Sequence, residues 1–311
     1  MRVPLSRAAM SRSKLSSRYL TIMFTLFAGV LPQLSTPAPA HTIGAIVPAY
    51  FYPGTGGPDA AGDGWAAMVA AAAQVPLTAI FNPDKGPLPG PADPNYANAM
   101  TNLDNAGGKV VGYVYTDYGN RPLATVEGEV STYIAQYGSL IDGFFLDGAS
   151  NSPSEIWYYD ALYLYIKGLG PSNLVIINPG LQPDQAYLST PTADIFTTYE
   201  NQNSSYAGAT PPSWVQDYPS GVFSNIIYDA PESSVLANIE LAAQRNVGSI
   251  YMTDRTMPNP FDQLPSYWNQ EVAAIAAWNA APVPEPGTLS LLGIAGSLAF
   301  VAFVAKKRML V

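Results

Sequence analysis

Residues 141–150 read Ile-Asp-Gly-Phe-Phe-Leu-Asp-Gly-Ala-Ser, so that three apolar side chains are followed at once by the carboxylate of Asp147. A short apolar run bounded by turn residues is typical of a strand that is buried on both faces of a parallel sheet. In parallel α/β folds, ligands bind at the carboxyl ends of the strands, which is where Asp147 would lie. An Asp at this position can alternatively cap the helix that follows it.

The same pattern recurs along the chain. Further apolar runs end in Asn82, Asn178, Glu200, Asp229 and Asp254. Strands are expected at residues 43–50, 77–81, 110–115, 143–147, 174–177, 195–199, 224–228 and 249–253. Helical segments are expected between them, at residues 63–74, 96–106, 123–137, 154–167, 183–188, 233–245 and 264–278, with a short one around Trp214. Eight strand–helix units predict a single (β/α)8 TIM-type barrel. No Gly-rich phosphate loop follows the first strand, which argues against a doubly wound nucleotide-binding sheet.

The first 40 residues have the features of a signal peptide. Five basic residues lie within residues 1–18, an apolar segment follows at 19–31, and Ala38-Pro39-Ala40 supplies a cleavage site of small residues. An apolar core of this length is short for a membrane-spanning helix. Residues 1–40 are therefore predicted to be removed by signal peptidase, and the exported chain is predicted to begin at His41.

The last 29 residues form a second targeting segment. Val283-Pro284-Glu285-Pro286 precedes an apolar stretch at residues 287–305, and Lys306-Lys307-Arg308 closes it. The length suits one transmembrane helix, and the basic cluster should stay on the cytoplasmic side. This three-part pattern resembles the PEP-CTERM sorting signal. The resemblance implies a Gram-negative bacterium, an exosortase that removes the tail, and a final place at the cell surface or in the extracellular matrix. A plain C-terminal membrane anchor is the alternative.

The predicted barrel, residues 41–282, is strongly acidic. It carries six basic and 22 acidic residues, a net charge of −16. Such a surface repels nucleic acid and anionic membranes. The chain has no Cys and one His, which excludes disulfides, thiolate metal sites and Ser-His-Asp or Cys-His catalysis. No cofactor and no metal are expected.

Polar and aromatic residues are expected to gather at the C-terminal rim of the barrel, where the strands end. Sugars present apolar faces that stack on aromatic rings and hydroxyls that bond carboxylates and amides. Glycosidic cleavage needs a carboxylic acid and a carboxylate on either side of the bond, and strands four and six would place Asp147 and Glu200 across such a gap. Asp229 and Asp254 can alternatively cap loops. Arg121 is expected either to clamp a rim carboxylate or to contact substrate.

With these residues in view, the chain resembles the spherulin-4 family, which is related to glycoside hydrolase family 135. The matching segments are residues 46–53 (IVPAYFYP), 80–83 (IFNP), 112–121 (GYVYTDYGNR), 142–147 (DGFFLD), 178–180 (NPG) and 198–200 (TYE). The resemblance implies a (β/α)8 barrel and endo-acting hydrolysis of polysaccharide that contains N-acetylgalactosamine. It also implies catalytic acids at an Asp-Glu pair after strand four and a Glu after strand six. Asp147 and Glu200 match two of these positions, whereas Gly148 replaces the Glu of the pair.

The sequence thus predicts an exported glycoside hydrolase of an amino-sugar exopolysaccharide, with Asp147 and Glu200 as the catalytic residues and their individual roles left open. The predicted substrate-binding residues are Tyr50, Tyr52, Asn82, Tyr113, Tyr115, Asp117, Tyr118, Arg121, Asn178, Asp229 and Asp254. The alternative, suggested by Gly148, is a non-catalytic glycan-binding or biofilm-matrix protein on the same barrel.

Overall fold

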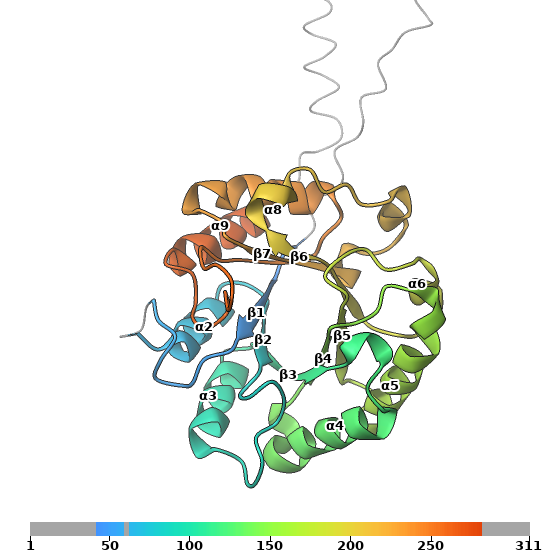
Figure 1. Ribbon diagram of the computed structural model, residues 1–311. Coiled ribbons are helices and arrows are strands. Elements are labelled where there is room, and N and C mark those ends of the chain that lie inside the picture. Colours follow the sequence, from blue (N-terminus) through green and yellow to red (C-terminus); the bar gives the residue numbers. More distant parts are fainter. Residues whose placement is uncertain (1–41, 59–61, 282–311) are drawn as a thin grey trace, which may run out of the picture. The chain divides into compact units, whose positions relative to one another are not determined.

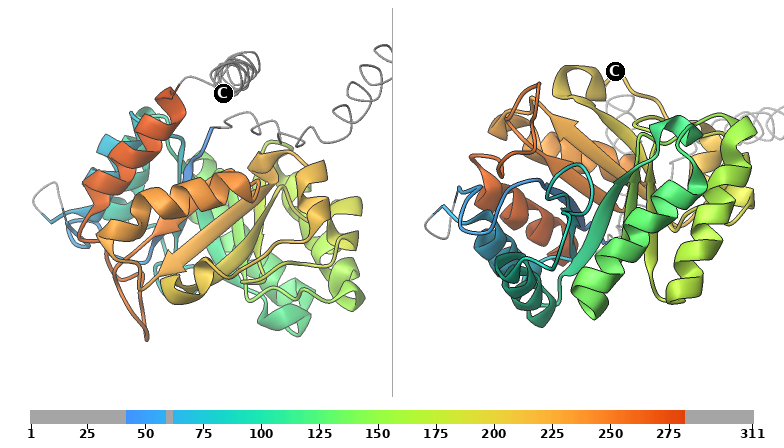
Figure 2. Two further views of the ribbon diagram at one scale, coloured as in Figure 1. Left: turned by 90° about the horizontal axis from the view of Figure 1, so that it is seen from above. Right: turned by 60° about the horizontal axis from the view of Figure 1, so that its bottom comes forward.

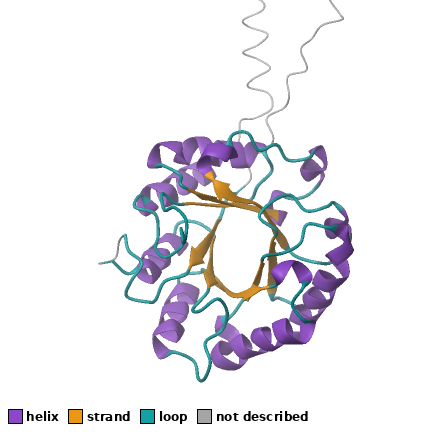
Figure 3. Cartoon of the chain, in the orientation of Figure 1, coloured by secondary structure: helices purple, strands orange, loops and turns teal. Residues whose placement is uncertain are grey.

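The computed structural model describes residues 42–58 and 62–281, which form a barrel of eight parallel strands inside a layer of helices (Figures 1 and 3). The strands pair in chain order, and a parallel bridge between Gly44 and Ser249 joins the two edges of the sheet. The strands are β1 (Ala45–Ala49), β2 (Leu77–Phe81), β3 (Lys109–Tyr115), β4 (Gly143–Asp147), β5 (Leu174–Asn178), β6 (Ile195–Gln202), β7 (Phe223–Tyr228) and β8 (Ser249–Met252). The predicted (β/α)8 barrel is confirmed.

The helices lie outside the strands, and Figure 2 shows α4 and α5 packed side by side on that outer surface. They are α2 (Gly64–Ala72), α3 (Pro94–Asn105), α4 (Leu123–Tyr137), α5 (Ile156–Leu169), α6 (Ala186–Ser189), α7 (Asn203–Tyr206), α8 (Val235–Gln244) and α9 (Trp268–Ala280). Within the described residues, no helix has the length and apolar character needed to cross a membrane. The predicted signal peptide and C-terminal spanning helix lie outside those residues.

Local sequence explains where several elements begin. The carboxylate of Asp63 accepts hydrogen bonds from the backbone N–H groups of Trp65 and Ala66 at 3.0 and 3.3 Å, and so caps α2. The carboxylate of Asp93 caps α3 through the N–H of Asn95 at 2.8 Å. The predicted boundaries agree with the structure to within a few residues for most elements. The exception is the segment after β6, predicted as a loop from residue 201, where β6 instead continues to Gln202 and the single turn of α7 follows.

The strands are buried on both faces, which is why their sequences are almost uninterrupted apolar runs. At the start of β4 the packing leaves no room for a side chain, because a Cβ on Gly143 would lie 2.0 Å from the carbonyl oxygen of Leu174. Asp142 lies at the N-terminal end of β4, where its Oδ2 accepts a 2.8 Å hydrogen bond from the N–H of Val110. Asp142 therefore lies at the opposite end of the barrel from Asp147, which ends the same strand.

Residues far apart in the chain close the barrel. The side chain of Asn279 on α9 accepts a hydrogen bond from the N–H of Ile43 at 2.8 Å and donates one to the carbonyl of Ile43 at 2.9 Å. The last helix is thereby tied to the residues just before β1. A closed sheet has a fixed rim, so the side chains that end the strands are held in a defined arrangement.

Candidate active site

A carboxylate pair lies at the ends of β4 and β6, with one amide between the two side chains. Asp147 ends β4 and is paired in register with Asn178, which ends β5. The Nδ2 group of Asn178 donates to Oδ1 of Asp147 at 2.7 Å and also to Oε2 of Glu200. Since a hydrogen bond spans about 3 Å, the two accepting oxygens lie within about 6 Å of each other.

The orientation of this amide is set by the turn after β5. Oδ1 of Asn178 accepts a 2.9 Å hydrogen bond from the N–H of Gly180, so the Nδ2 group is the one that faces the acids. The carbonyl of Gly180 in turn accepts a 3.0 Å hydrogen bond from the N–H of Glu200. The Asn-Pro-Gly turn therefore fixes both the amide and the backbone that carries the second acid.

A bulge in β6 decides which way Glu200 points. Thr197 pairs with Ser224, but Tyr199 pairs with Asn225, so Thr198 is an extra residue on β6. In a strand, a slip of one residue turns a side chain to the opposite face, and bulges are common beside active sites for this reason. The hydroxyl of Thr198 holds the bulge in place by donating to Oδ1 of Asn225 at 3.0 Å.

Aromatic rings support the acids from the side of β1 and β3. The hydroxyl of Tyr113 donates to Oδ2 of Asp147 at 2.7 Å. The ring of Tyr50 meets the ring of Tyr113 edge-on, with centroids 5.6 Å apart, and meets Phe261 in the same way at 5.6 Å. Burial is the main cause that raises the pKa of Tyr113, so its hydroxyl keeps its proton and remains a donor to the carboxylate.

The surroundings raise the pKa of both acids, but not by the same route. Burial raises the pKa of Glu200 to about 7, and the charge of Asp147 adds to the rise. Burial also raises the pKa of Asp147, but hydrogen bonds from Tyr113, Asn178 and the backbone of Gly148 act in the opposite direction. Asp147 is thus the better stabilised carboxylate, and Glu200 is the carboxyl that holds its proton near neutral pH.

The rings of Tyr50 and Tyr113 also line a cavity of about 650 Å³ at the rim, a size typical of small-molecule sites. The other residues that line it are Asn82, Pro83, Asp84, Lys85, Tyr115, Arg121, Glu129, Pro258 and Asn259. Five of the predicted substrate-binding residues thus lie around one cavity: Tyr50, Asn82, Tyr113, Tyr115 and Arg121. Whether they contact substrate remains a prediction.

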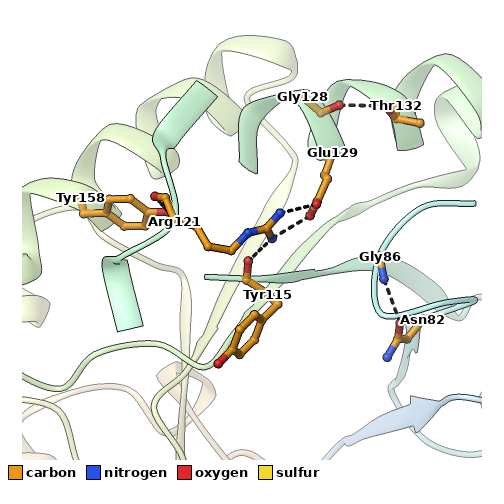
Figure 4. Close-up of polar contacts among 8 residues, drawn as sticks. All are labelled: Asn82, Gly86, Tyr115, Arg121, Gly128, Glu129, Thr132 and Tyr158. Atoms are coloured by element: carbon orange, nitrogen blue, oxygen red, sulfur yellow. Dashed lines mark hydrogen bonds and ion pairs between the residues drawn. The ribbon is translucent and has the colours of Figure 1, made fainter. Parts of the chain in front are cut away.

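Arg121 acts as a clamp, although its partner is not a strand-end carboxylate. Its guanidinium donates to both carboxylate oxygens of Glu129 on α4 and to the carbonyl of Tyr115 (Figure 4). The carbonyl of Arg121 accepts a 2.8 Å hydrogen bond from the hydroxyl of Tyr158 on α5. The same view shows Oδ1 of Asn82 accepting from the N–H of Gly86 at 3.2 Å. The loop after β3 is therefore fixed to two outer helices.

Within that loop, two consecutive non-glycine residues adopt the left-handed conformation. The φ angles are 51° at Asp117 and 56° at Tyr118, which is uncommon for bulky side chains. The N–H of Tyr118 donates to the carbonyl of Gly148 at 2.6 Å, and the carboxylate of Asp117 accepts from the hydroxyl of Tyr115 at 3.2 Å. The ring of Tyr118 is left 57% exposed. Strain of this kind at a rim fits a role in binding.

Gly148, directly after Asp147, is required by the local geometry. Its φ is +57°, and a Cβ built there would lie 2.4 Å from Cε2 of Tyr115. The ring of Tyr115 thus occupies the space that a side chain at position 148 would need. In this chain, therefore, the Glu that the family pattern has at this position is replaced by Gly148, and the ring of Tyr115 fills its place.

Six predicted binding residues are not among those that line the cavity beside Tyr50 and Tyr113. Three of them are described above, since Asn178 bridges the two acids and Asp117 and Tyr118 lie in the loop after β3. The other three lie elsewhere. The hydroxyl of Tyr52 donates to Asp93 at 3.0 Å and accepts from Asn95 at 2.6 Å, which places it at the start of α3. Asp254 accepts hydrogen bonds from the N–H and hydroxyl of Ser266, so the alternative of a loop cap describes it. Asp229 is exposed in a left-handed turn with φ of 53°.

Six residues that line the cavity were not predicted as site residues, and neither was Phe261, which packs against Tyr50: the six are Pro83, Asp84, Lys85, Glu129, Pro258 and Asn259. Glu129 lies on a helix rather than at a strand end, and the β8–α9 connection that carries Asn259 and Phe261 has no regular pattern. A signal existed for Glu129 alone, since Arg121 needed an acidic partner and Glu129 lies two turns into the next helix.

Comparisons with known proteins agree with the fold. The sequence model of spherulation-specific family 4 matches residues 44–275, and that of the PEP-CTERM protein-sorting motif matches residues 282–308. The chain is 34% identical to Spherulin-4 of Physarum polycephalum over 257 residues, which cover 78% of this chain and 73% of that protein. It is also similar to the crystal structure of Aspergillus clavatus Sph3 in complex with GalNAc, with a TM-score of 0.64 and 23% identity over 78% of this chain and 99% of that one.

Proposed function

The chain belongs to spherulation-specific family 4, and we propose from this membership that it is an exported glycoside hydrolase of an amino-sugar exopolysaccharide of the N-acetylgalactosamine type. The observation that carries the proposal is the pair Asp147 and Glu200, held by one amide nitrogen of Asn178 at the barrel rim. Hydrolysis of a glycosidic bond requires two such carboxyl groups. The GalNAc bound to Sph3 supports the substrate class.

The pKa difference distinguishes the two roles. Glu200, whose pKa is raised to about 7, is the general acid that gives its proton to the glycosidic oxygen as the bond to the anomeric carbon breaks. Asp147, whose carboxylate form is favoured by hydrogen bonds from Tyr113, Asn178 and the backbone of Gly148, faces the positive charge that develops on the sugar. After the leaving sugar departs, Glu200 as carboxylate takes a proton from the attacking water.

The separation of the acids favours retention of the anomeric configuration. Inverting enzymes keep their carboxyl groups roughly 6.5–9.5 Å apart so that a water fits between them. Here the two oxygens that accept from the same nitrogen of Asn178 lie within about 6 Å of each other, which is below that range. The covalent or cyclic intermediate of a retaining reaction is formed either by Asp147 or by the N-acetyl oxygen of the substrate, with Asp147 stabilising the charge.

Gly148 supports a second candidate, a non-catalytic glycan-binding or biofilm-matrix protein. The family Glu is absent and the ring of Tyr115 occupies its space, so a member that has lost catalysis would still keep an aromatic cavity suited to sugars. Binding of glycans without products, equally strong in Asp147→Asn and Glu200→Gln variants, would favour this candidate. Products from the parent chain alone would exclude it.

The targeting segments complete the proposal. The sorting motif at residues 282–308 fits export to the cell surface or extracellular matrix of a Gram-negative bacterium, with residues 1–40 as signal peptide, 41–282 as the barrel and 283–311 as the sorting segment. Signal peptidase and an exosortase would be the processing partners, with the C-terminal helix in the inner membrane until cleavage. The size of the secreted protein, measured by mass spectrometry in a host with and without exosortase, tests this processing.

A further inference from the structure

A second hollow adjoins the cavity beside the acids. It has a volume of about 300 Å³ and is lined by residues of the β8–α9 connection: Asp254, Arg255, Thr256, Pro258, Asn259, Asp262 and Gln263. Pro258 and Asn259 also line the larger cavity of about 650 Å³. The two hollows therefore share a wall, and a polymer that leaves the acid pair on this side of the rim would meet the second hollow next.

Arg255 lies half-buried in this second hollow, and its guanidinium makes no hydrogen bond or ion pair with any of the described residues. Among the described residues the two ion pairs are those of Arg121 and Lys167, and the guanidinium of Arg245 bonds two carbonyl oxygens. The backbone of Arg255 is fixed, since its carbonyl accepts from Asp229 at 2.9 Å and its N–H donates to Thr253 at 3.1 Å. The guanidinium therefore keeps N–H donors that can bind a ligand in the hollow.

The remaining polar groups of the hollow supply both acceptors and donors. The carboxylate of Asp262 is exposed and unbonded, and the side chains of Thr256 and Gln263 make no hydrogen bond with the described residues. Asn259 accepts from the N–H of Phe261 at 3.3 Å through Oδ1, which leaves its Nδ2 group to donate. A neutral sugar with hydroxyl and N-acyl groups needs this mixture, whereas the carboxylates of Asp254 and Asp262 would repel an anionic one.

Resting on the proposed function, we propose that the hollow of the β8–α9 connection is an outlying subsite for a neutral, hydroxyl-rich sugar of the same polysaccharide chain. Arg255 and Asp262 bind its oxygens, and Asn259 lies between it and the cavity beside the acids. The hollow then binds a sugar unit that is not one of the two joined by the cleaved bond. Long chains gain affinity from this subsite, and short ones cannot reach it.

The test is the dependence of binding on chain length in the full-length chain, purified in detergent. Oligosaccharides of two to eight units, prepared from N-acetylgalactosamine, galactosamine, N-acetylglucosamine and galactose polymers, are titrated into a Glu200→Gln background, and cleavage is measured in the parent. Arg255→Gln is compared with Lys109→Gln, a matched loss of one charge at the N-terminal start of β3. A charge-assisted hydrogen bond corresponds to a loss of about tenfold or more in affinity.

The loss is expected for long oligosaccharides only, in Arg255→Gln and in Asp262→Asn but not in Lys109→Gln. Asp262 is exposed and its side chain bonds none of the described residues, so its variant remains informative if Arg255→Gln fails to fold. An equal effect at every length, or no effect, overturns the subsite while cleavage by the parent upholds the hydrolase. Length-dependent loss without any products upholds the subsite and overturns the hydrolase. Failure of the parent to bind every class and length overturns both.

Discussion

The raised pKa of Glu200 predicts that replacing it with Gln makes the barrel more stable at alkaline pH. In the folded chain the pKa of this carboxyl is about 7, against 4.5 as its ordinary value, and burial is the main cause. The folded state therefore binds the proton more tightly than the unfolded state. Stability from this site is fully present below about pH 4.5 and is lost as the pH rises through about 7.

The size of the effect follows from the shift. A difference of about 2.5 pKa units at about 1.36 kcal/mol each corresponds to roughly 3 kcal/mol of stability lost by the parent at high pH. Glu200→Gln cannot ionise, and its side-chain oxygen can still accept from the Nδ2 group of Asn178. The variant should therefore exceed the parent in free energy of unfolding at about pH 8.5, and the gap should shrink by about 2–3 kcal/mol at about pH 5.

Urea unfolding of residues 41–282, followed by circular dichroism at the two pH values, measures this gap. Glu240→Gln is the matched control, because Glu240 lies exposed on α8 and its substitution reports the exchange of side chains alone. A gap that is the same at both pH values, or a variant less stable than the parent at about pH 8.5, would refute the account of a buried, proton-holding Glu200. This test does not depend on knowing the substrate.

Three further perturbations test other parts of the site. Asn178→Ala removes the hydrogen bond that lowers the pKa of both acids. The pH at which kcat/KM falls on the alkaline side should therefore rise by about one unit, with a loss of about 10–100-fold in rate. An unchanged alkaline pH dependence would contradict the bridging role of Asn178. Gly148→Glu restores the family residue at a φ of +57° against the ring of Tyr115, and should cost about 1–3 kcal/mol in urea unfolding without a gain in activity. A stable and more active variant would show that the ring can yield. A double-mutant cycle of Arg121→Ala and Glu129→Ala should give a coupling of roughly 0.5–1 kcal/mol in unfolding free energy. Additive effects would mean that the ion pair of Arg121 and Glu129 in Figure 4 does not stabilise the fold.

The barrel could be predicted because its signals are local. Phe144, Phe145 and Leu146 are followed by Asp147, and this pattern of an apolar run with a polar end marks six of the eight strands without reference to any other. The same local pattern located Asn178 and Glu200 at the rim. Neighbouring strand ends in a closed sheet must lie together, so topology alone brought these three residues close.

The details of the site depend on contacts that local sequence does not carry. The direction of Glu200 depends on the bulge at Thr198, which is set by pairing with β7. The orientation of the Asn178 amide depends on Gly180. Tyr52 and Asp254 are of residue types that bind sugars, but each makes structural hydrogen bonds instead. Tyr52 bonds Asp93 at the start of α3, and Asp254 bonds Ser266 in the β8–α9 connection. Glu129 was overlooked because its role appears only when the β3–α4 loop folds back onto α4.

The most direct test of the central claim is cleavage of a panel of amino-sugar polysaccharides by residues 41–282, with products read by mass spectrometry. Asp147→Asn and Glu200→Gln variants of equal fold, checked by circular dichroism, are the controls. The account predicts oligosaccharides from the parent with N-acetylgalactosamine polymer and none from either variant. No products from the parent on any polymer, with binding unchanged in both variants, would contradict hydrolysis by this carboxylate pair.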